Sequence, residues 1–334
     1  MKRRWATVYA ILCTLLFVGG LVVAFIFSFF AGEKEMLACL ISMFAGFVYV
    51  PTFHECGHLF FLSINKMECV YIKCFCFAQY IKDGKKRIKF ASPFAPDQTQ
   101  AMPKCGGNMK KRASAYTFGG LIFSAVLLVV LVGAGVTLAL LGKFSFALWG
   151  AVPYAAYIFF LNVAPFEYPS GPTDASVYRS IKKEDDTATV MLAAMEIQGQ
   201  IYAGKSFGEV DENLYFNVPQ LCEDDKLFAV ILELRYRYYI EKANFEKAAD
   251  CLNRLVQVQE YLTIEEIEKV AAELTYMHAL NGDYERAEES GKLCQNYLKE
   301  NNPTAKRILA AYSAAFGKTD AARILIAQAQ ELMA

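Results

Sequence analysis

The chain has 334 residues, 55% of which are hydrophobic, and its 34 Lys and Arg side chains balance its 34 Asp and Glu side chains. So apolar a composition excludes a single ordinary soluble domain. The hydrophobic residues are concentrated in the first half of the chain, in long runs that carry few charges or none.

Four of these runs are each long enough to cross a bilayer, which takes about 20 residues. We expect them to be helices, because a segment in lipid must satisfy its own backbone hydrogen bonds. The first run is long for a signal peptide and has no small-residue cleavage pattern, so we expect it to remain as an anchor. The predicted spans are residues 6–30, 36–62, 113–141 and 145–166.

The segment between the second and third predicted spans contains a strand pattern. Residues 70–81 are rich in β-branched and aromatic side chains, and Asp83-Gly84 is a hairpin turn signal ahead of residues 85–90. We therefore expect a β-hairpin at the cytoplasmic face of the membrane. The following stretch, 91–109, is rich in proline, glycine and polar residues, which predicts a loop.

The distribution of lysine and arginine predicts which ends of the spans face the cytoplasm. Lys2, Arg3 and Arg4 precede the first span, and residues 66–112 contain 11 Lys and Arg against 3 Asp and Glu. The connections on the other side of the membrane are short and nearly neutral. We therefore expect both termini in the cytoplasm. The short loops and the compact layout favour a bacterial plasma membrane.

The C-terminal part has the composition of a soluble domain and helical periodicity. Three of its segments align with one another, and their final alanines, Ala248, Ala287 and Ala322, are 39 and 35 residues apart. Each segment lies between two amphipathic helices. This pattern resembles tetratricopeptide-type helical hairpins, whose period is about 34 residues, although a generic helical bundle remains the alternative.

We accordingly divide the chain into a transmembrane core, residues 1–180, and a cytoplasmic helical domain, residues 181–334. The C-terminal part carries an excess of acidic residues, which argues against binding to nucleic acid. We expect this domain to select substrates or to bind a regulatory protein. The predicted fold is an all-α membrane protein of about four transmembrane helices with a small β-hairpin.

The second predicted span contains the sequence His54-Glu55-Cys56-Gly57-His58 near its cytoplasmic end. On a helix, positions i and i+4 lie on one face, so the two imidazoles can hold one zinc ion. Glu55 can then accept a proton from a water molecule bound to that ion. Ionisable residues within a span are costly and usually functional, although packing between helices is the structural alternative.

A catalytic zinc ion needs a third protein ligand and an open position for water. Asn162-Val-Ala-Pro165 ends the fourth span, and Asp174 follows it on the cytoplasmic side. Two independently placed sets of side chains therefore reach the same membrane depth. Glu167 is the acidic alternative to Asp174 as the third ligand, although a solvated helix cap is its simpler role.

In this order, the elements resemble the site-2 protease family of intramembrane zinc metalloproteases over about residues 36–180. The resemblance includes small residues in the third span, from Gly119-Gly120 to Ser124, which let helices pack closely. It implies a membrane-associated β element that presents the substrate by strand addition. It also implies that His54, His58 and Asp174 bind zinc. By the same resemblance, Glu55 is the general base and Asn162 helps to bind the substrate.

Two features depart from the family pattern. Ala175 replaces the glycine that usually follows the aspartate, and the interval before Asp174 is longer, with Pro169, Gly171 and Pro172 inserted. These departures motivate an alternative, which is a catalytically degenerate membrane scaffold that binds partners through its helical domain. A prenyl-protein-processing type of membrane peptidase is a third interpretation, but the Asn162 to Asp174 segment and the four-span layout count against it.

The main expectation is an intramembrane zinc endopeptidase with one Zn²⁺ ion per chain. Its substrate would be a membrane-spanning protein or a membrane-embedded peptide, cleaved near the cytoplasmic side. The substrate helix must unwind locally, because a helical carbonyl is shielded by its own hydrogen bond. Zinc would supply hydroxide at neutral pH, and Glu55 would pass the proton to the leaving amine.

Overall fold

The structure of the chain is a computed structural model that describes residues 2–82, 85–93, 95, 97–168, 171–258, 260 and 262–333. The predicted turn at Asp83-Gly84 and the inserted Pro169 lie outside these residues. The chain divides into two compact units, Met1–Ala203 and Gly204–Ala334. Residues 181–203, which we expected in the C-terminal domain, belong to the first unit.

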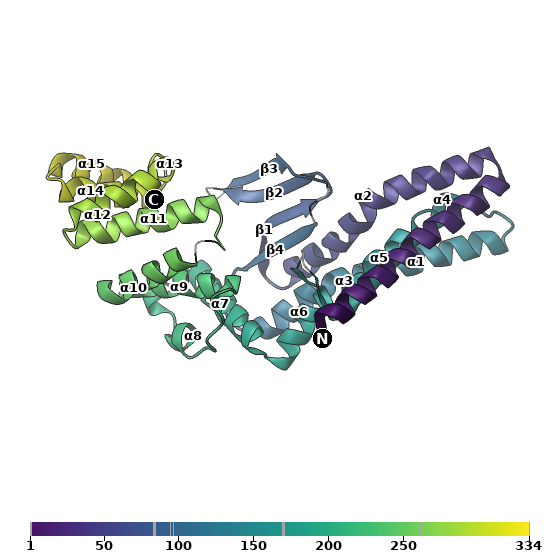
Figure 1. The fold of residues 1–334 in the computed structure, drawn as a ribbon, viewed down its shortest axis with the longest axis horizontal. Coiled ribbons are helices and arrows are strands. Elements are labelled where there is room, and N and C mark those ends of the chain that lie inside the picture. Colours follow the sequence, from purple (N-terminus) through teal and green to yellow (C-terminus); the bar gives the residue numbers. More distant parts are fainter. Residues whose placement is uncertain are drawn as a thin grey trace. The chain divides into compact units, whose positions relative to one another are not determined.

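The first unit contains four helical segments that are long and apolar enough to cross a membrane (Figure 1). They are α1 (Lys2–Ala31), α2 (Glu33–Ile64), α3 (Met109–Leu140) and the pair α4 (Phe146–Trp149) and α5 (Val152–Val163). Large apolar side chains such as Leu16, Phe44 and Val129 are exposed on these helices. A surface of this kind is compatible with contact to lipid.

The fourth segment is interrupted between α4 and α5, whereas composition predicted one span. At Gly150 a Cβ atom would lie 2.9 Å from the Cβ of Ser42 in α2, so glycine permits this close approach. Val152 and Pro153 then open α5, where proline is favoured because the first helical N–H groups have no partner inside the helix. The prediction of one span followed the apolar composition and did not use Gly150 and Pro153, the residues of the sequence that could have marked the break.

Helices α2 and α3 approach each other through glycines. A Cβ atom at Gly57 would lie 2.8 Å from the Cβ of Phe123, and one at Gly119 would lie 2.6 Å from the carbonyl oxygen of Gly57. Neither glycine could carry a side chain without moving the helices apart. The expected role of the Gly119-Gly120 pair in helix packing therefore holds for Gly119.

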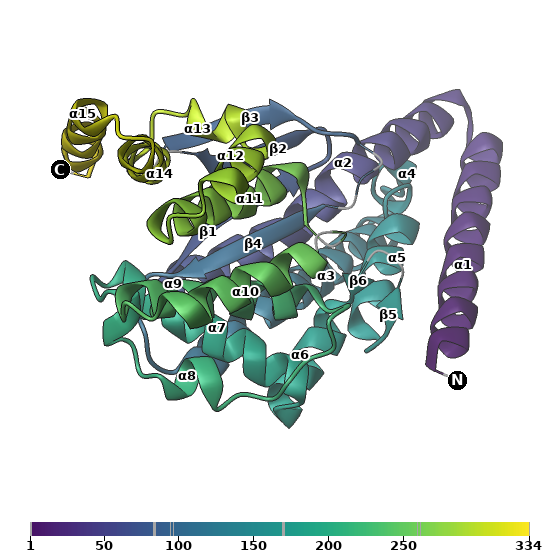
Figure 2. The same cartoon turned by 60° about the vertical axis from the view of Figure 1, so that its left-hand side comes forward.

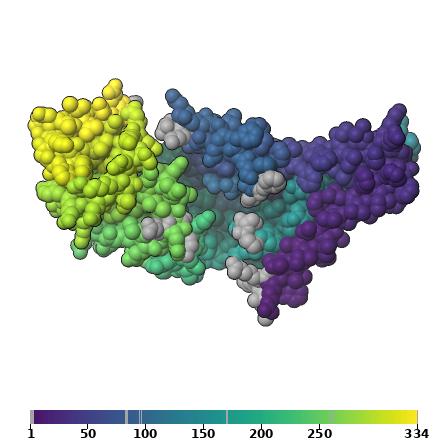
Figure 3. Space-filling view, turned by 45° about the horizontal axis from the view of Figure 1, so that its top comes forward, coloured from purple at the N-terminus to yellow at the C-terminus, as the bar shows by residue number. Residues whose placement is uncertain are grey.

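A four-stranded antiparallel sheet follows α2 in the chain, with the strand order β3-β2-β1-β4. Figure 2 shows the strands of this sheet, and in Figure 3 its surface (blue) continues from that of α2 (purple). Helix α7 (Asp186–Tyr202) contacts β4. The strands are β1 (Met67–Cys74), β2 (Phe77–Lys82), β3 (Lys85–Phe90) and β4 (Gln98–Pro103).

The predicted hairpin is present as β2 and β3, but two expectations about this region were wrong. Residues 70–81 form parts of two strands, because Phe75 takes a left-handed conformation (φ 51°) that closes a tight turn. No glycine or asparagine marks this turn in the sequence. The expected loop 91–109 contains β4, whose polar residues pair with β1, and pairing of that kind leaves no hydrophobic pattern.

After α5 the chain forms a short two-stranded ladder, β5 (Glu167–Tyr168) with β6 (Gly171–Pro172). Two helices, α6 (Asp174–Lys183) and α7 (Asp186–Tyr202), complete the first unit. Helix α7 also fixes the connection after β4, since both carboxylate oxygens of Glu196 accept the backbone N–H of Gly107, at 2.9 and 2.8 Å.

The second unit is helical. After the short helices η1 (Phe207–Glu209) and α8 (Asn213–Phe216), three helical hairpins follow one another, with α13 (Gln295–Leu298) between the second and the third. The hairpins pair α9 (Lys226–Glu241) with α10 (Phe245–Gln257), α11 (Ile264–Leu280) with α12 (Tyr284–Leu293), and α14 (Pro303–Ala315) with α15 (Thr319–Glu331).

The three segments that align in sequence are the turns of these hairpins. Each turn contains one residue with positive φ, namely Ala243 (53°), Gly282 (73°) or Gly317 (73°). The alanine that ends each aligned segment is buried in the helix that follows. The repeat therefore reflects one turn geometry used three times, whereas the relationship to tetratricopeptide proteins stays a prediction.

Candidate metal centre

Helix α2 carries the first part of the site. His54 and His58 are one helical turn apart and lie on the face that packs against α3, where their exposed fractions are 7% and 6%. Glu55 is 4% exposed. One of the apolar helices therefore carries three buried ionisable side chains, at the place that the sequence pattern predicted.

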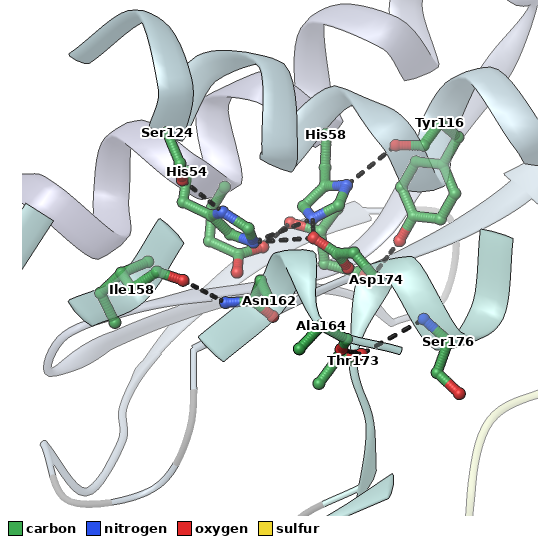
Figure 4. Close-up of polar contacts among 12 residues, drawn as sticks. His54, His58, Tyr116, Ser124, Ile158, Asn162, Ala164, Thr173, Asp174 and Ser176 are labelled. Atoms are coloured by element: carbon green, nitrogen blue, oxygen red, sulfur yellow. Dashed lines mark hydrogen bonds and ion pairs between the residues drawn. The ribbon is translucent and has the colours of Figure 1, made fainter. Parts of the chain in front are cut away.

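Helix α6 supplies the acidic residue. Thr173 caps this helix, because its hydroxyl oxygen accepts the backbone N–H of Ser176 at 3.2 Å and its hydroxyl donates to the carbonyl of Ala164 at 2.7 Å. This cap ties the start of α6 to the end of α5. Asp174, the first residue of α6, is thereby held beside the two histidines (Figure 4).

Three ligand atoms converge at this point. The Nε2 atoms of His54 and His58 are 3.3 Å apart, and Oδ2 of Asp174 lies 3.1 Å and 3.4 Å from them. Ligand atoms at about 2.05 Å from a zinc ion, with tetrahedral angles, would be about 3.3 Å apart. The three side chains therefore have a spacing that fits zinc. Among the residues that the structure describes, this is the one group of three such ligands.

The other ring nitrogen of each histidine is held by α3. Nδ1 of His54 lies 2.8 Å from the hydroxyl of Ser124, and Nδ1 of His58 lies 2.9 Å from the carbonyl oxygen of Tyr116. A carbonyl can only accept, so Nδ1 of His58 carries the proton and Nε2 of the neutral ring presents a lone pair. Contacts of this type orient histidine ligands in metal sites.

Two further observations agree with a metal at this position. A Cβ atom at Gly120 would lie 2.7 Å from Nε2 of His54 and would also press on Nε2 of His58, so glycine keeps the space next to the ligand atoms clear. Oδ2 of Asp174 is buried, and the polar atoms beside it are the two histidine Nε2 atoms, which give it no donor when both face it with a lone pair. A buried carboxylate oxygen without a donor is costly unless a cation binds it.

Glu167, the alternative third ligand, does not join this group. It lies in β5, is exposed, and pairs through its backbone with Pro172. The geometry therefore favours Asp174, which was also preferred on sequence. Ala175, which departs from the pattern expected from the resemblance, is an ordinary second residue of α6 and leaves Asp174 in place.

The three ligand side chains and Glu55 line a cavity of about 640 Å³, a volume in the range of small-ligand and peptide sites. Its apolar wall includes Phe47, Tyr154 and Ile158. Asn162 also lines it, and its side-chain N–H donates to the carbonyl of Ile158 at 3.1 Å. The Asn162 side chain thus bonds within its own helix and faces the cavity, and its expected role in substrate binding stays a prediction.

Sequence analysis did not identify Tyr116 and Thr99 as parts of the site, and it assigned Ser124 to helix packing. A signal for two of these residues was available, because Tyr116, Gly120 and Ser124 recur every four residues and share one face of α3. Thr99 gave no signal, because it lies in a segment predicted to be a loop. Its hydroxyl donates to Oε2 of Glu55 at 2.5 Å.

Among the described residues, no cysteine belongs to the group of candidate metal ligands. Burial, together with the neighbouring Glu55 and Asp97 carboxylates, raises the pKa of the Cys74 thiol in β1 to about 12. The thiol is therefore protonated at neutral pH, whereas the thiolate is the form that binds metals.

Comparisons with known protein families, curated proteins and solved structures find no match to this chain.

Proposed function

We propose that the protein is an intramembrane zinc endopeptidase of the site-2 protease type. The observation that carries this proposal is the convergence of His54, His58 and Asp174 in a cavity lined in part by helices long and apolar enough to cross a membrane. Two imidazoles and one carboxylate are a ligand set of catalytic zinc sites. A cavity lined in part by such helices favours a substrate that is itself embedded in the membrane.

The chemistry would be hydrolysis of a peptide bond. Zinc, when bound, polarises the carbonyl and lowers the pKa of a coordinated water to about 7. Glu55 would accept the proton of the attacking water and donate it to the leaving amine, so that one C–O bond forms and one C–N bond breaks. The buried position of Glu55 beside both histidines suits it to this transfer.

The alternative is a scaffold that has lost activity. The two departures that motivated this alternative are Ala175 and the inserted segment, and they affect α6 and β5–β6 rather than the ligand atoms. A scaffold would have no need for a glycine at position 120, beside the ligand nitrogens, or for a buried Glu55. These features favour the enzyme.

The proposal can be tested by comparing membrane fractions from cells that express the wild-type protein or Glu55→Gln at equal levels. Mass spectrometry would identify newly formed protein termini. We expect new termini within predicted membrane spans for the wild type, their loss for Glu55→Gln, and their loss when 1,10-phenanthroline is added to the wild type. Identical sets of termini from both proteins would contradict the proposal.

A further inference from the structure

Thr99 contacts the proposed general base from outside the membrane helices. Its hydroxyl, on β4, donates to Oε2 of Glu55, while Glu55 itself belongs to α2. A carboxylate has two oxygens, and a donor fixed on one of them restricts rotation of the group. Oε1 is then the oxygen left to accept a proton.

Tyr116 connects Thr99 to one of the histidines. The Tyr116 hydroxyl donates to the carbonyl of Thr99, and the backbone carbonyl of Tyr116 accepts from Nδ1 of His58. The chain of contacts therefore runs from His58 in α2 through α3 and β4 and returns to Glu55 in α2. A metal ligand and the proposed base are thus held by one connected set of hydrogen bonds.

The backbone is held in place by side-chain contacts both before and after Thr99 in the sequence. Two residues before it, Asp97 forms a 2.7 Å ion pair with Lys73 of β1, which is 2% exposed. The connection after β4 is held to α7 by the carboxylate of Glu196. Because the backbone is anchored on either side of Thr99, the side chain has a defined place beside Glu55.

We propose that Thr99 is a positioning residue that orients the Glu55 carboxylate for proton transfer, and that Tyr116 holds Thr99 in place. This inference rests on the proposed function. It makes activity depend on the β sheet as well as on the membrane helices. Loss of a contact behind a metal ligand typically costs about 10- to 100-fold in affinity or activity, and we expect a loss of the same order for the contact behind Glu55.

The test uses the full-length protein, with formation of new termini in the membrane fraction as the readout. Thr99→Val keeps the shape of the side chain and removes the hydroxyl, whereas Thr99→Ser keeps the hydroxyl. We expect Thr99→Val to lower cleavage about 10- to 100-fold with unchanged zinc content. We expect Thr99→Ser to stay within about 3-fold of the wild type, because the hydrogen bond is retained.

A purely structural role would give the opposite order, because valine favours strands more than serine does. Tyr116→Phe is a second variant, which leaves the sequence of β4 unchanged. It removes the hydroxyl that donates to the Thr99 carbonyl, and we expect it to lower cleavage because Thr99 is then held less firmly. Full cleavage by both Thr99→Val and Tyr116→Phe, with Glu55→Gln inactive, would overturn this inference alone. Cleavage by Glu55→Gln at the wild-type level would overturn the proposed function as well.

Discussion

At the scale of single residues, Gly120 gives a direct test of the space around the ligand atoms. A methyl group at this position would meet Nε2 of both histidines, so we expect Gly120→Ala to lose bound zinc. Gly133→Ala in the same helix is the matched control, because a Cβ there meets nothing within 4 Å. Metal analysis of both purified variants checks this prediction, and zinc retained by Gly120→Ala would contradict it.

Ser124 tests whether the contacts behind the histidines matter. Ser124→Ala removes the partner of His54 Nδ1, and we expect zinc affinity to fall about 10- to 100-fold. Ser114→Ala is the control, since this serine is also buried in α3 but its hydroxyl has no hydrogen-bond partner. Competition with a chelator measures both affinities. Equal affinities for the two variants would show that the Ser124 contact is dispensable.

The residues that could be predicted are those whose neighbours follow from helix geometry. His54 and His58 were placed by the spacing of four, and Asp174 by the expectation that two segments end at one membrane depth. Thr99 could not be placed, because its contact with Glu55 depends on how β4 pairs with β1. No local pattern encodes a pairing between segments that lie about 30 residues apart.

At the scale of the elements, the three helical hairpins of the second unit share one turn conformation. Ala243 has a φ of 53° where the other two turns have glycine, and a left-handed conformation costs a non-glycine residue about 1 kcal/mol. We therefore expect Ala243→Gly to stabilise the second unit by about that amount, and Gly282→Ala to destabilise it. Thermal unfolding of the full-length variants checks both signs. A lower melting temperature for Ala243→Gly would contradict the expectation.

The elements also show where composition misleads. The four apolar helices and the β2–β3 hairpin were predicted, since long apolar runs and a glycine turn are strong signals. The turn at Phe75 and the strand β4 were missed, because a left-handed phenylalanine and a polar strand are both stabilised by their surroundings. The break before α5 was missed because the apolar composition was followed, although Gly150 and Pro153 stand at that place in the sequence.

At the scale of the whole molecule, the chain combines an apolar helical core that contains a candidate metal centre with a second, soluble-type helical unit. The proposal assigns catalysis to the first unit. The second unit consists of helical hairpins, and we expect it to recruit a regulator or a substrate. All parts of the account depend on one point, which is that the His54, His58 and Asp174 side chains bind zinc.

The most direct test is the zinc content per chain of protein purified in detergent after zinc-replete expression. We expect about one zinc ion per wild-type chain, little or none in Asp174→Ala, and a full complement in Glu167→Ala, because Glu167 lies outside the ligand group. A wild-type protein without zinc would contradict the account. Zinc retained by Asp174→Ala and lost from Glu167→Ala would contradict the ligand assignment.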